Sequence, residues 1–203
     1  MSLAPLVVVS GPSGVGKSTV VAAALALNAD IWLSVSATTR APRTGEQEGR
    51  EYSFVTGERF DELVATEGLL EWASYSGNRY GTPREPVEEH RRAGRPVLLE
   101  IEVQGARQVR AASPSALLVF LEPPSWEVLT GRLVGRGTES DESVARRLQA
   151  AREELAAADE FDEVLVNADV QECAAALVRL VADHRAPESQ HPDEERSTPT
   201  NEA

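Results

Sequence analysis

Apolar residues occur along the chain in two alternating patterns, short continuous runs and stripes at helical spacing. The continuous runs predict strands buried on both faces of a parallel sheet, and they cover residues 6–9, 97–102, 116–121 and 163–166. The stripes predict helices over residues 18–27, 104–111, 125–136, 141–158 and 170–184. Such alternation is typical of an α/β fold built around a central parallel sheet.

The pattern changes between the first predicted helix and the second apolar run. Residues 31–38 alternate apolar and small polar side chains, which predicts one strand. A stretch rich in Arg, Gly, Glu and Pro follows from Thr39, and after it we expect short strands and helices in turn. The strands are expected at 52–55, 69–75 and 78–82, and the helices at 58–66, with Thr56 as N-cap, and at 83–93.

These patterns predict one main domain with two smaller units attached. Residues 1–37, 96–124 and 159–185 are expected to form the α/β core, and residues 38–95 an inserted α+β subdomain. Residues 125–158 are expected to form a helical hairpin, the second of these units. The segment 186–203 combines three prolines and five acids with almost no apolar residues, so we expect it to be disordered.

Composition narrows the classes of function. The 203 residues are 41% hydrophobic and 26% charged, which is enough for a folded core, and the net charge of −13 argues against general nucleic-acid binding. We find no basic leader and no apolar run long enough for a membrane span. The single cysteine, Cys173, excludes an internal disulfide, so we expect a cytoplasmic protein. The three histidines lie too far apart in sequence to indicate a metal site.

The clearest chemical signal is a glycine-rich stretch between the first strand and the first helix. It has the spacing of a phosphate-binding P-loop, in which backbone N–H groups and the helix N-terminus surround the phosphates, a lysine reaches the outer phosphates and a serine holds Mg²⁺. The residues of this motif are Gly11, Pro12, Ser13, Gly14, Val15, Gly16, Lys17, Ser18 and Thr19.

Lys17 is also the only lysine among the 20 basic residues of the chain. Everywhere else the positive charge is an arginine. A compact ammonium fits among crowded phosphates where a planar guanidinium does not, so we interpret this exception as a steric requirement of the site.

Two acidic residues, Glu100 and Glu102, end the predicted strand 97–102. An acid at the end of a buried strand downstream of a P-loop is the pattern of the strand that orders Mg²⁺, although many strands end in glutamate. Alternation places both carboxylates on one side of the strand, so we expect them to face the same cleft.

Four arginines are crowded into the hairpin of residues 125–158: Arg132, Arg136, Arg146 and Arg147. In so acidic a chain they fit either a solvated helix face or a mobile lid over a polyphosphate. The pattern alone does not choose between the two.

Several ordered blocks over about residues 5–184 resemble the guanylate kinase family, whose members transfer the γ-phosphoryl group of ATP to GMP. The P-loop is shared with many nucleotide-binding proteins, but two blocks are more specific: Thr38-Thr39-Arg40-Ala41-Pro42-Arg43 and Tyr80-Gly81-Thr82. Further blocks of the resemblance are 34–46, 49–55, 70–73 and 132–139.

The resemblance implies a three-layer P-loop NTPase core with an inserted GMP-binding subdomain and a lid. It also implies an enzyme of purine metabolism that uses ATP, Mg²⁺ and GMP or dGMP, without an obligate protein partner. The GMP-binding residues implied are Ser36, Arg40, Arg43, Tyr52, Glu71, Tyr80, Thr82 and Glu102. On the ATP side the resemblance implies the P-loop, Asn167 near adenine, the lid arginines Arg132, Arg136 and Arg147, and Mg²⁺ held by Ser18 and, through water, Glu100.

Two other functions remain open at this level. Guanylate-kinase-like domains of scaffold proteins bind peptides and have lost catalysis, but such domains tend to lack an intact P-loop. A phosphoryl acceptor of another kind, such as a phosphorylated sugar, would keep the reaction type and change the substrate. The family also often carries aspartate where this chain has Glu100 and Glu102, which adds a methylene group at each position.

Overall fold

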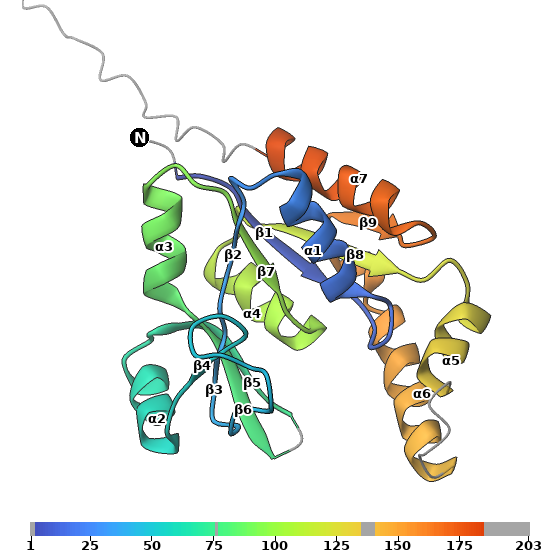
Figure 1. Cartoon of the computed structure of the whole chain (residues 1–203), viewed down its shortest axis with the longest axis horizontal. Helices are drawn as coiled ribbons and strands as arrows, with labels where there is room; N and C mark the ends of the chain where they lie inside the picture. Colours follow the sequence, from blue (N-terminus) through green and yellow to red (C-terminus); the bar gives the residue numbers. More distant parts are fainter. Residues whose placement is uncertain (1–2, 76, 135–140, 185–203) are drawn as a thin grey trace, which may run out of the picture.

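The computed structural model describes residues 3–75, 77–134 and 141–184. Its main sheet has five strands in the order β2-β7-β1-β8-β9, and all of them run parallel (Figure 1). The strands are β1 (Leu6–Ser10), β2 (Trp32–Leu33), β7 (Val97–Glu100), β8 (Leu117–Glu122) and β9 (Glu163–Val166). This confirms the predicted α/β fold around a central parallel sheet.

Helices cover both faces of this sheet and make the fold three layers deep. Alternate residues of β1 point to opposite faces, so Val7 and Val9 pack with helices α1 (Lys17–Leu27) and α7 (Val170–Asp183). Leu6 and Val8 pack with α3 (Arg84–Arg92) and α4 (Val103–Ala112) on the other face. All five residues of β1 are buried, as expected for the middle strand of a covered parallel sheet.

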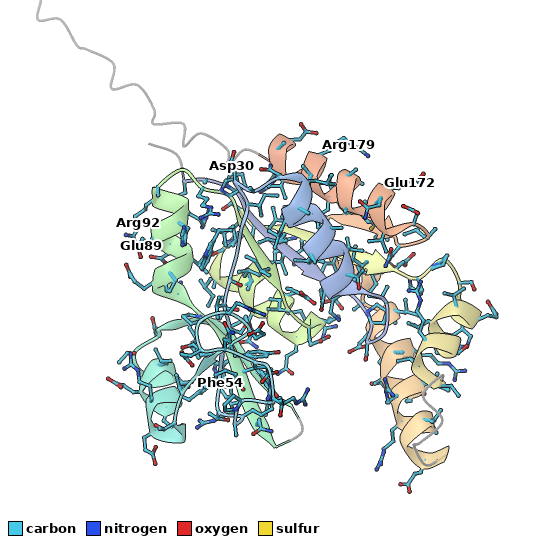
Figure 2. The ribbon with its side chains drawn as sticks, viewed as in Figure 1. Asp30, Phe54, Glu89, Arg92, Glu172 and Arg179 are labelled. Carbon is cyan, nitrogen blue, oxygen red and sulfur yellow. The ribbon has the colours of Figure 1, made fainter. Side chains whose placement is uncertain are left out.

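The outer faces of the covering helices are polar. Glu89 and Arg92 of α3, and Glu172 and Arg179 of α7, are exposed and point away from the sheet (Figure 2). Cys173, on the inner side of α7, is 3% exposed, and burial raises the pKa of its thiol. No helix within the described residues is both long and apolar enough to cross a membrane.

A second, mixed sheet of four strands lies beside the core, in the order β4-β3-β6-β5 (Figure 1). Its strands are β3 (Ala37–Thr38), β4 (Ser53–Phe54), β5 (Leu69–Tyr75) and β6 (Asn78–Pro83). Helix α2 (Gly57–Ala65) covers it through the buried Phe60, and the Thr56 hydroxyl accepts a 3.2 Å hydrogen bond from the Arg59 amide. Thr56 is therefore the N-cap that the sequence predicted.

Two predicted strands were wrong in extent. The stretch 31–38 is not one strand: β2 joins the main sheet and β3 joins the second sheet, because the chain crosses between them at residues 34–36. The strand expected over 97–102 ends at Glu100, and Glu102 is the N-cap residue of α4. The direction of the Glu102 side chain is therefore set by its place at the start of α4 and not by alternation along a strand.

The predicted helical hairpin consists of α5 (Trp126–Val134) and α6 (Asp141–Leu155), which pack through Leu129, Leu133 and Ala151. These helices extend from the opposite side of the core to α2 (Figure 1). The helix expected to reach residue 158 ends at Leu155, and a short 3₁₀ helix, Ala158–Glu160, leads into β9. The end of the helix predicted over 125–136 and the tail at 186–203 lie outside the described residues.

Candidate active site

The P-loop connects β1 to α1, as the sequence predicted, and its glycines are required by geometry. Gly11 has φ 148°, and a Cβ there would lie 2.4 Å from the Leu121 carbonyl oxygen. Gly16 has φ 100° and is the N-cap residue of α1. A side chain at either position would strain the backbone, and at Gly11 it would also clash with the neighbouring strand.

Two side chains from distant parts of the chain hold the turn of this loop. The Val15 carbonyl accepts hydrogen bonds from Asn167 Nδ2 at 2.8 Å and from the Arg132 guanidinium at 2.9 Å. Asn167 is 2% exposed, and its Oδ1 has no hydrogen-bond donor among the described residues. Asn167 and Arg132 were both predicted as ATP-side residues, and both lie against the P-loop.

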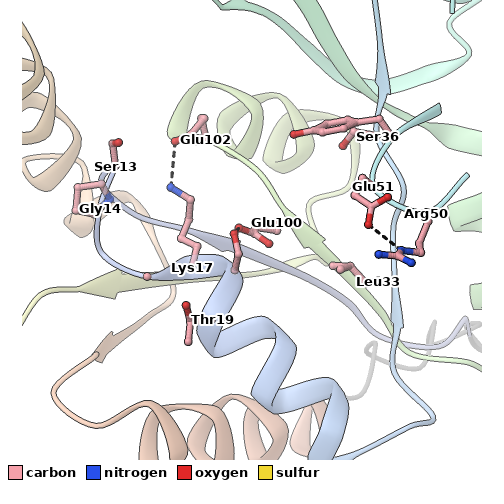
Figure 3. Close-up of a pocket in the computed structure, with 14 residues that line it drawn as sticks. Ser13, Gly14, Lys17, Thr19, Leu33, Ser36, Arg50, Glu51, Glu100 and Glu102 are labelled. Carbon is pink, nitrogen blue, oxygen red and sulfur yellow. Dashed lines mark hydrogen bonds and ion pairs between the residues drawn. The ribbon is translucent and has the colours of Figure 1, made fainter. Parts of the chain in front are cut away.

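Lys17 lies at the mouth of the loop, where Figure 3 shows it directed at Glu102. Its ammonium group donates to the Gly11 carbonyl at 2.7 Å and to Glu102 Oε2 at 3.3 Å. Glu102 is exposed and Lys17 is largely covered, with 60% and 10% of their side chains accessible. The lysine charge is thus held at the loop by contacts that an incoming phosphate could replace.

Ser18 and Glu100 form the oxygen pair expected for a metal ion. The Ser18 hydroxyl donates to Glu100 Oε1 at 2.6 Å. Among the described residues no three His, Cys, Asp or Glu side chains group closely enough to hold a metal by themselves. Mg²⁺ usually takes one or two protein oxygens together with water and substrate phosphates, so this pair has the chemistry that Mg²⁺ requires.

A cleft of about 720 Å³ opens in front of the P-loop (Figure 3). Its lining includes Lys17 and the pair Ser18 and Glu100, and the far wall carries Arg50 and Glu51. A second pocket of about 310 Å³ adjoins it. The two share four lining residues: Ser36, Tyr52, Glu100 and Glu102. Two ligands in these pockets would therefore meet at this common wall.

Seven of the eight residues predicted to bind GMP line this second pocket: Ser36, Arg40, Arg43, Tyr52, Glu71, Tyr80 and Glu102. The eighth, Thr82, contacts Glu71 instead. The structure thus brings together residues from the stretch rich in Arg, Gly, Glu and Pro that begins at Thr39, from both sheets and from the start of α4. Glu100 and Glu102 face a common space as expected, although they belong to a strand and a helix cap respectively.

Arg40 is held in place by Glu46, which the sequence analysis did not single out. Two guanidinium nitrogens of Arg40 donate to the Glu46 carboxylate at 2.8 and 3.0 Å. The same carboxylate accepts from the Arg43 amide at 2.7 Å, and these bonds hold the pKa of Glu46 below its usual value. A fork-to-fork pair of this kind fixes the orientation of the guanidinium.

Aromatic side chains complete this wall of the pocket. The Arg40 guanidinium carbon lies 5.3 Å from the centre of the Tyr52 ring, and the Tyr52 and Tyr80 rings meet edge to face with centres 5.8 Å apart. Burial raises the pKa of Tyr52. Its hydroxyl therefore keeps its proton and remains a hydrogen-bond donor at neutral pH.

Glu71 is the acid at the deep end of this pocket. It is 6% exposed, and the Thr82 hydroxyl donates to its Oε1 at 2.7 Å. Burial raises the pKa of Glu71, while the hydrogen bonds from Thr82 act in the opposite direction. The site therefore supplies a buried carboxylate whose ionised form is stabilised by the hydrogen bonds from Thr82.

The sequence left open whether the hairpin arginines form a solvated helix face or a lid over a polyphosphate, and the structure shows that they do not all behave alike. Arg146 is solvated: 73% of its side chain is exposed, and within the described part of the chain it forms an ion pair at 3.5 Å with Glu142, one turn away. Arg132 contacts the P-loop, and Arg147 donates to the Leu133 carbonyl at 3.3 Å. Arg136 lies outside the described residues.

Glu154 of α6 is a site residue that sequence reasoning missed. Its Oε2 accepts a 3.0 Å hydrogen bond from the Ser13 amide, 141 residues away in the chain. Burial raises the pKa of Glu154, with Glu102 adding to the shift and Lys17 opposing it. An acid in a charged helix gives no local signal that it will reach the P-loop.

Comparisons with known proteins agree with this geometry. The family model described as guanylate kinase matches residues 4–184. A guanylate kinase of Thermobifida fusca (strain YX) is 61% identical over 177 residues, which cover 87% of this chain and 90% of the relative. A guanylate kinase of Streptomyces coelicolor is 60% identical over 86% of this chain and 89% of its own length. The crystal structure of guanylate kinase from Anaplasma phagocytophilum superposes with a TM-score of 0.69 at 33% identity, covering 89% of this chain and 86% of that one.

Proposed function

Because the chain belongs to the guanylate kinase family and is therefore an ATP:GMP phosphotransferase, we propose that its two adjoining pockets divide the substrates between them. ATP occupies the P-loop cleft and GMP the pocket of Arg40 and Glu71. The observation that carries this division is the wall of four residues common to both pockets. Beside Tyr52 and Glu100 of that wall the GMP phosphate and the γ-phosphate of ATP would face each other.

We propose that Glu71 selects guanine. The Watson–Crick edge of guanine offers N–H donors at N1 and N2, and one carboxylate can accept from both. Adenine has an acceptor at N1 and no amino group at C2, so it would leave the acid unpaired. The hydrogen bond from Thr82 supports this role because it orients the carboxylate. Ser36 and Glu102 complete the base side of the same pocket.

The GMP phosphate is assigned to Arg40, Arg43, Tyr52 and Tyr80. Arginines can fork around phosphate oxygens and tyrosine hydroxyls add neutral donors. The fixed Arg40–Glu46 pair supports the assignment, because an oriented guanidinium loses little freedom on binding. None of these contacts requires a 2′-hydroxyl, so dGMP is expected to be an acceptor too.

On the donor side, the P-loop amides and Lys17 hold the ATP phosphates, with Asn167 toward adenine and Arg132, Arg136 and Arg147 closing the lid. Ser18 would hold Mg²⁺ directly and Glu100 through a water molecule. When bound, the metal ion would neutralise charge on the β- and γ-phosphates. The Ser18–Glu100 oxygen pair supports this placement.

The reaction itself needs alignment rather than a general base. An oxygen of the GMP phosphate attacks the γ-phosphorus of ATP, the bond to the β-γ bridging oxygen breaks, and ADP and GDP form. Lys17 and the lid arginines counter the charge on the transferring group, and closure would exclude water.

We further propose that residues 38–95 and 125–158 act as two bodies that close over the core formed by 1–37, 96–124 and 159–185. The packing of α3 against the main sheet through Val87 suggests that the first of these bodies moves mainly as its second sheet and α2. A cytoplasmic location is proposed from the single thiol, because proteins of reducing compartments rarely need disulfides.

A coupled assay of ADP release tests the assignment of the pockets. We expect GMP and dGMP to be phosphorylated, AMP to be a poor acceptor and ribose phosphates to be inert. Replacing Glu71 by Ala should remove the preference for GMP over AMP. If the variant keeps the full preference, Glu71 does not read the base.

A further inference from the structure

The carboxylate of Glu71 lies directly against the backbone of a helix. A Cβ atom on Gly105 of α4 would lie 2.6 Å from Glu71 Oε2 and 3.1 Å from its Cδ. Gly105 also lines the acceptor pocket itself. The carboxylate therefore occupies the space that any other residue at position 105 would fill.

Backbone conformation does not explain this glycine. Gly105 lies inside α4, away from the left-handed region in which other glycines of the chain are found. Glycine inside a helix costs about 1 kcal/mol relative to alanine. Gly105 weakens the helix but leaves room for the Glu71 carboxylate. The position of that carboxylate is therefore the best explanation for a glycine here.

One turn further along α4, Gln108 holds the backbone next to Glu71. Its Oε1 accepts from the Trp72 amide at 3.1 Å and its Nε2 donates to the Trp72 carbonyl at 2.8 Å. Strand β5 is the last strand of its sheet, so these two backbone groups have no partner strand on that side. Gln108 satisfies both of them as a neighbouring strand would.

The strand is also irregular at this place. The pairing of β5 with β6 shifts register between Leu69 and Glu71. Such a shift re-aims the side chain that follows it. Because residues three apart in a helix share a face, Gly105 and Gln108 together meet the re-aimed segment.

We propose that Gly105 and Gln108 are positioning residues for guanine selection: Gly105 makes room for the Glu71 carboxylate, and Gln108 fixes the strand that carries it. The inference rests on the proposed role of Glu71. The proposal adds that α4, a helix of the core, controls the selectivity for guanine, although Glu71 itself belongs to the second sheet.

Replacing Gly105 by Ala is the direct test. The methyl group would displace the carboxylate from its bonds with guanine, so we expect the KM for GMP to rise about 10-fold to 100-fold, the range of a lost hydrogen bond to a charged group. The KM for ATP should stay within about twofold of wild type, a split that general loss of structure would not produce. The matched control is Gly131→Ala, another helical glycine, where a Cβ would meet no atom of another described element within 4 Å. Equal KM values for GMP in Gly105→Ala and wild type would overturn the proposal.

Two further variants separate this proposal from the role of Glu71. In a Glu71→Ala background the methyl group at position 105 would meet only the end of the Ile101 side chain, at 3.2 Å, among the neighbours that it would otherwise crowd. Gly105→Ala should then add little to the KM for GMP; full additivity would contradict the proposal. If Glu71→Ala alone leaves the preference for GMP intact, the proposed role of Glu71 in selecting guanine is wrong, and the positioning role falls with it. If Glu71→Ala loses the preference and Gly105→Ala keeps wild-type KM values, only the positioning role fails.

Gln108→Leu keeps the volume of the side chain and removes both hydrogen bonds to Trp72. We expect the KM for GMP to rise and selectivity over AMP to fall, with the KM for ATP unchanged. Gln149→Leu is the control, because Gln149 pairs with Glu153 on an exposed helix face. A Gln108 variant with wild-type selectivity would contradict the role of Gln108.

Discussion

The carboxylate of Glu154, on α6 of the helical hairpin, accepts a hydrogen bond from the amide of Ser13 in the P-loop. A carboxylate therefore occupies a backbone amide that, in the proposed function, would bind a phosphate oxygen of ATP. Burial raises the pKa of Glu154, and the hydrogen bond from the Ser13 amide and the charge of Lys17 only oppose that rise. This contact predicts that Glu154 opposes the binding of ATP.

Replacing Glu154 by Gln removes the charge and keeps an oxygen that can accept from Ser13. We expect the KM for ATP to fall about threefold to tenfold, the effect of one partly screened charge near a phosphate, with the KM for GMP unchanged. Initial rates at fixed GMP measure this. A rise in the KM for ATP would instead mean that the ionised acid supports the loop.

Lys17→Ala should lose about 10²-fold to 10³-fold in kcat, because the charge that meets the transferring phosphoryl group is gone. Folding should be retained, since the hydrogen bonds of the Lys17 ammonium group within the described residues are to the Gly11 carbonyl and the exposed Glu102. Lys17→Arg should also be impaired, because a guanidinium does not fit the loop. Near wild-type kcat in Lys17→Ala would exclude the proposed chemistry.

Glu71→Gln should have opposite effects on stability and on activity. The pKa of Glu71 is raised in the folded protein, so ionising this group costs stability as the pH rises through that pKa. At pH 7.5 the Gln variant, which has no buried charge, should be more stable to urea than wild type. The difference should vanish below about pH 4.3, the ordinary glutamate value, because wild-type Glu71 is then protonated in both states.

The activity of the same variant should fall, since an amide nitrogen in place of one oxygen repels the guanine donors. For wild type, the KM for GMP should rise on acidification, because a protonated Glu71 loses acceptor capacity. A KM for GMP that is independent of pH down to pH 4.5 in wild type would contradict this role.

Removal of Mg²⁺ by EDTA should abolish phosphoryl transfer, and added Mg²⁺ should restore it. Ser18→Ala and Glu100→Ala should each raise the Mg²⁺ concentration needed for half-maximal rate. Glu100→Asp serves as the comparison, because a shorter carboxylate can still reach a metal-bound water. An unchanged Mg²⁺ requirement in Glu100→Ala would place the metal elsewhere.

Much of the fold follows from local pattern. The uninterrupted apolar residues of β1 require cover on both faces, and the stripe of α7 supplies one of the covers. The P-loop was also readable, since Gly11 and Gly16 adopt backbone conformations that few other residues tolerate. In each case the pattern itself lies within one strand, one helix or one loop.

What local pattern could not decide was the partner of each segment. The alternation of residues 31–38 is a property of a single strand, whereas its division between two sheets depends on Leu98 and Gly81, far away in the sequence. Glu102 likewise faces the cleft as a helix cap rather than as a strand residue.

The sequence by itself therefore determined which chemical groups the protein uses: one lysine in a glycine loop, acids after a buried strand, and paired arginines and tyrosines. Only the tertiary structure decided what surrounds them. Gly105 behind Glu71, Glu46 beneath Arg40 and Glu154 on Ser13 are contacts formed by folding, and the pKa shifts of Glu71 and Glu154 arise from burial. Burial is a property of the packed chain, because each residue is desolvated by neighbours that its own sequence position does not specify.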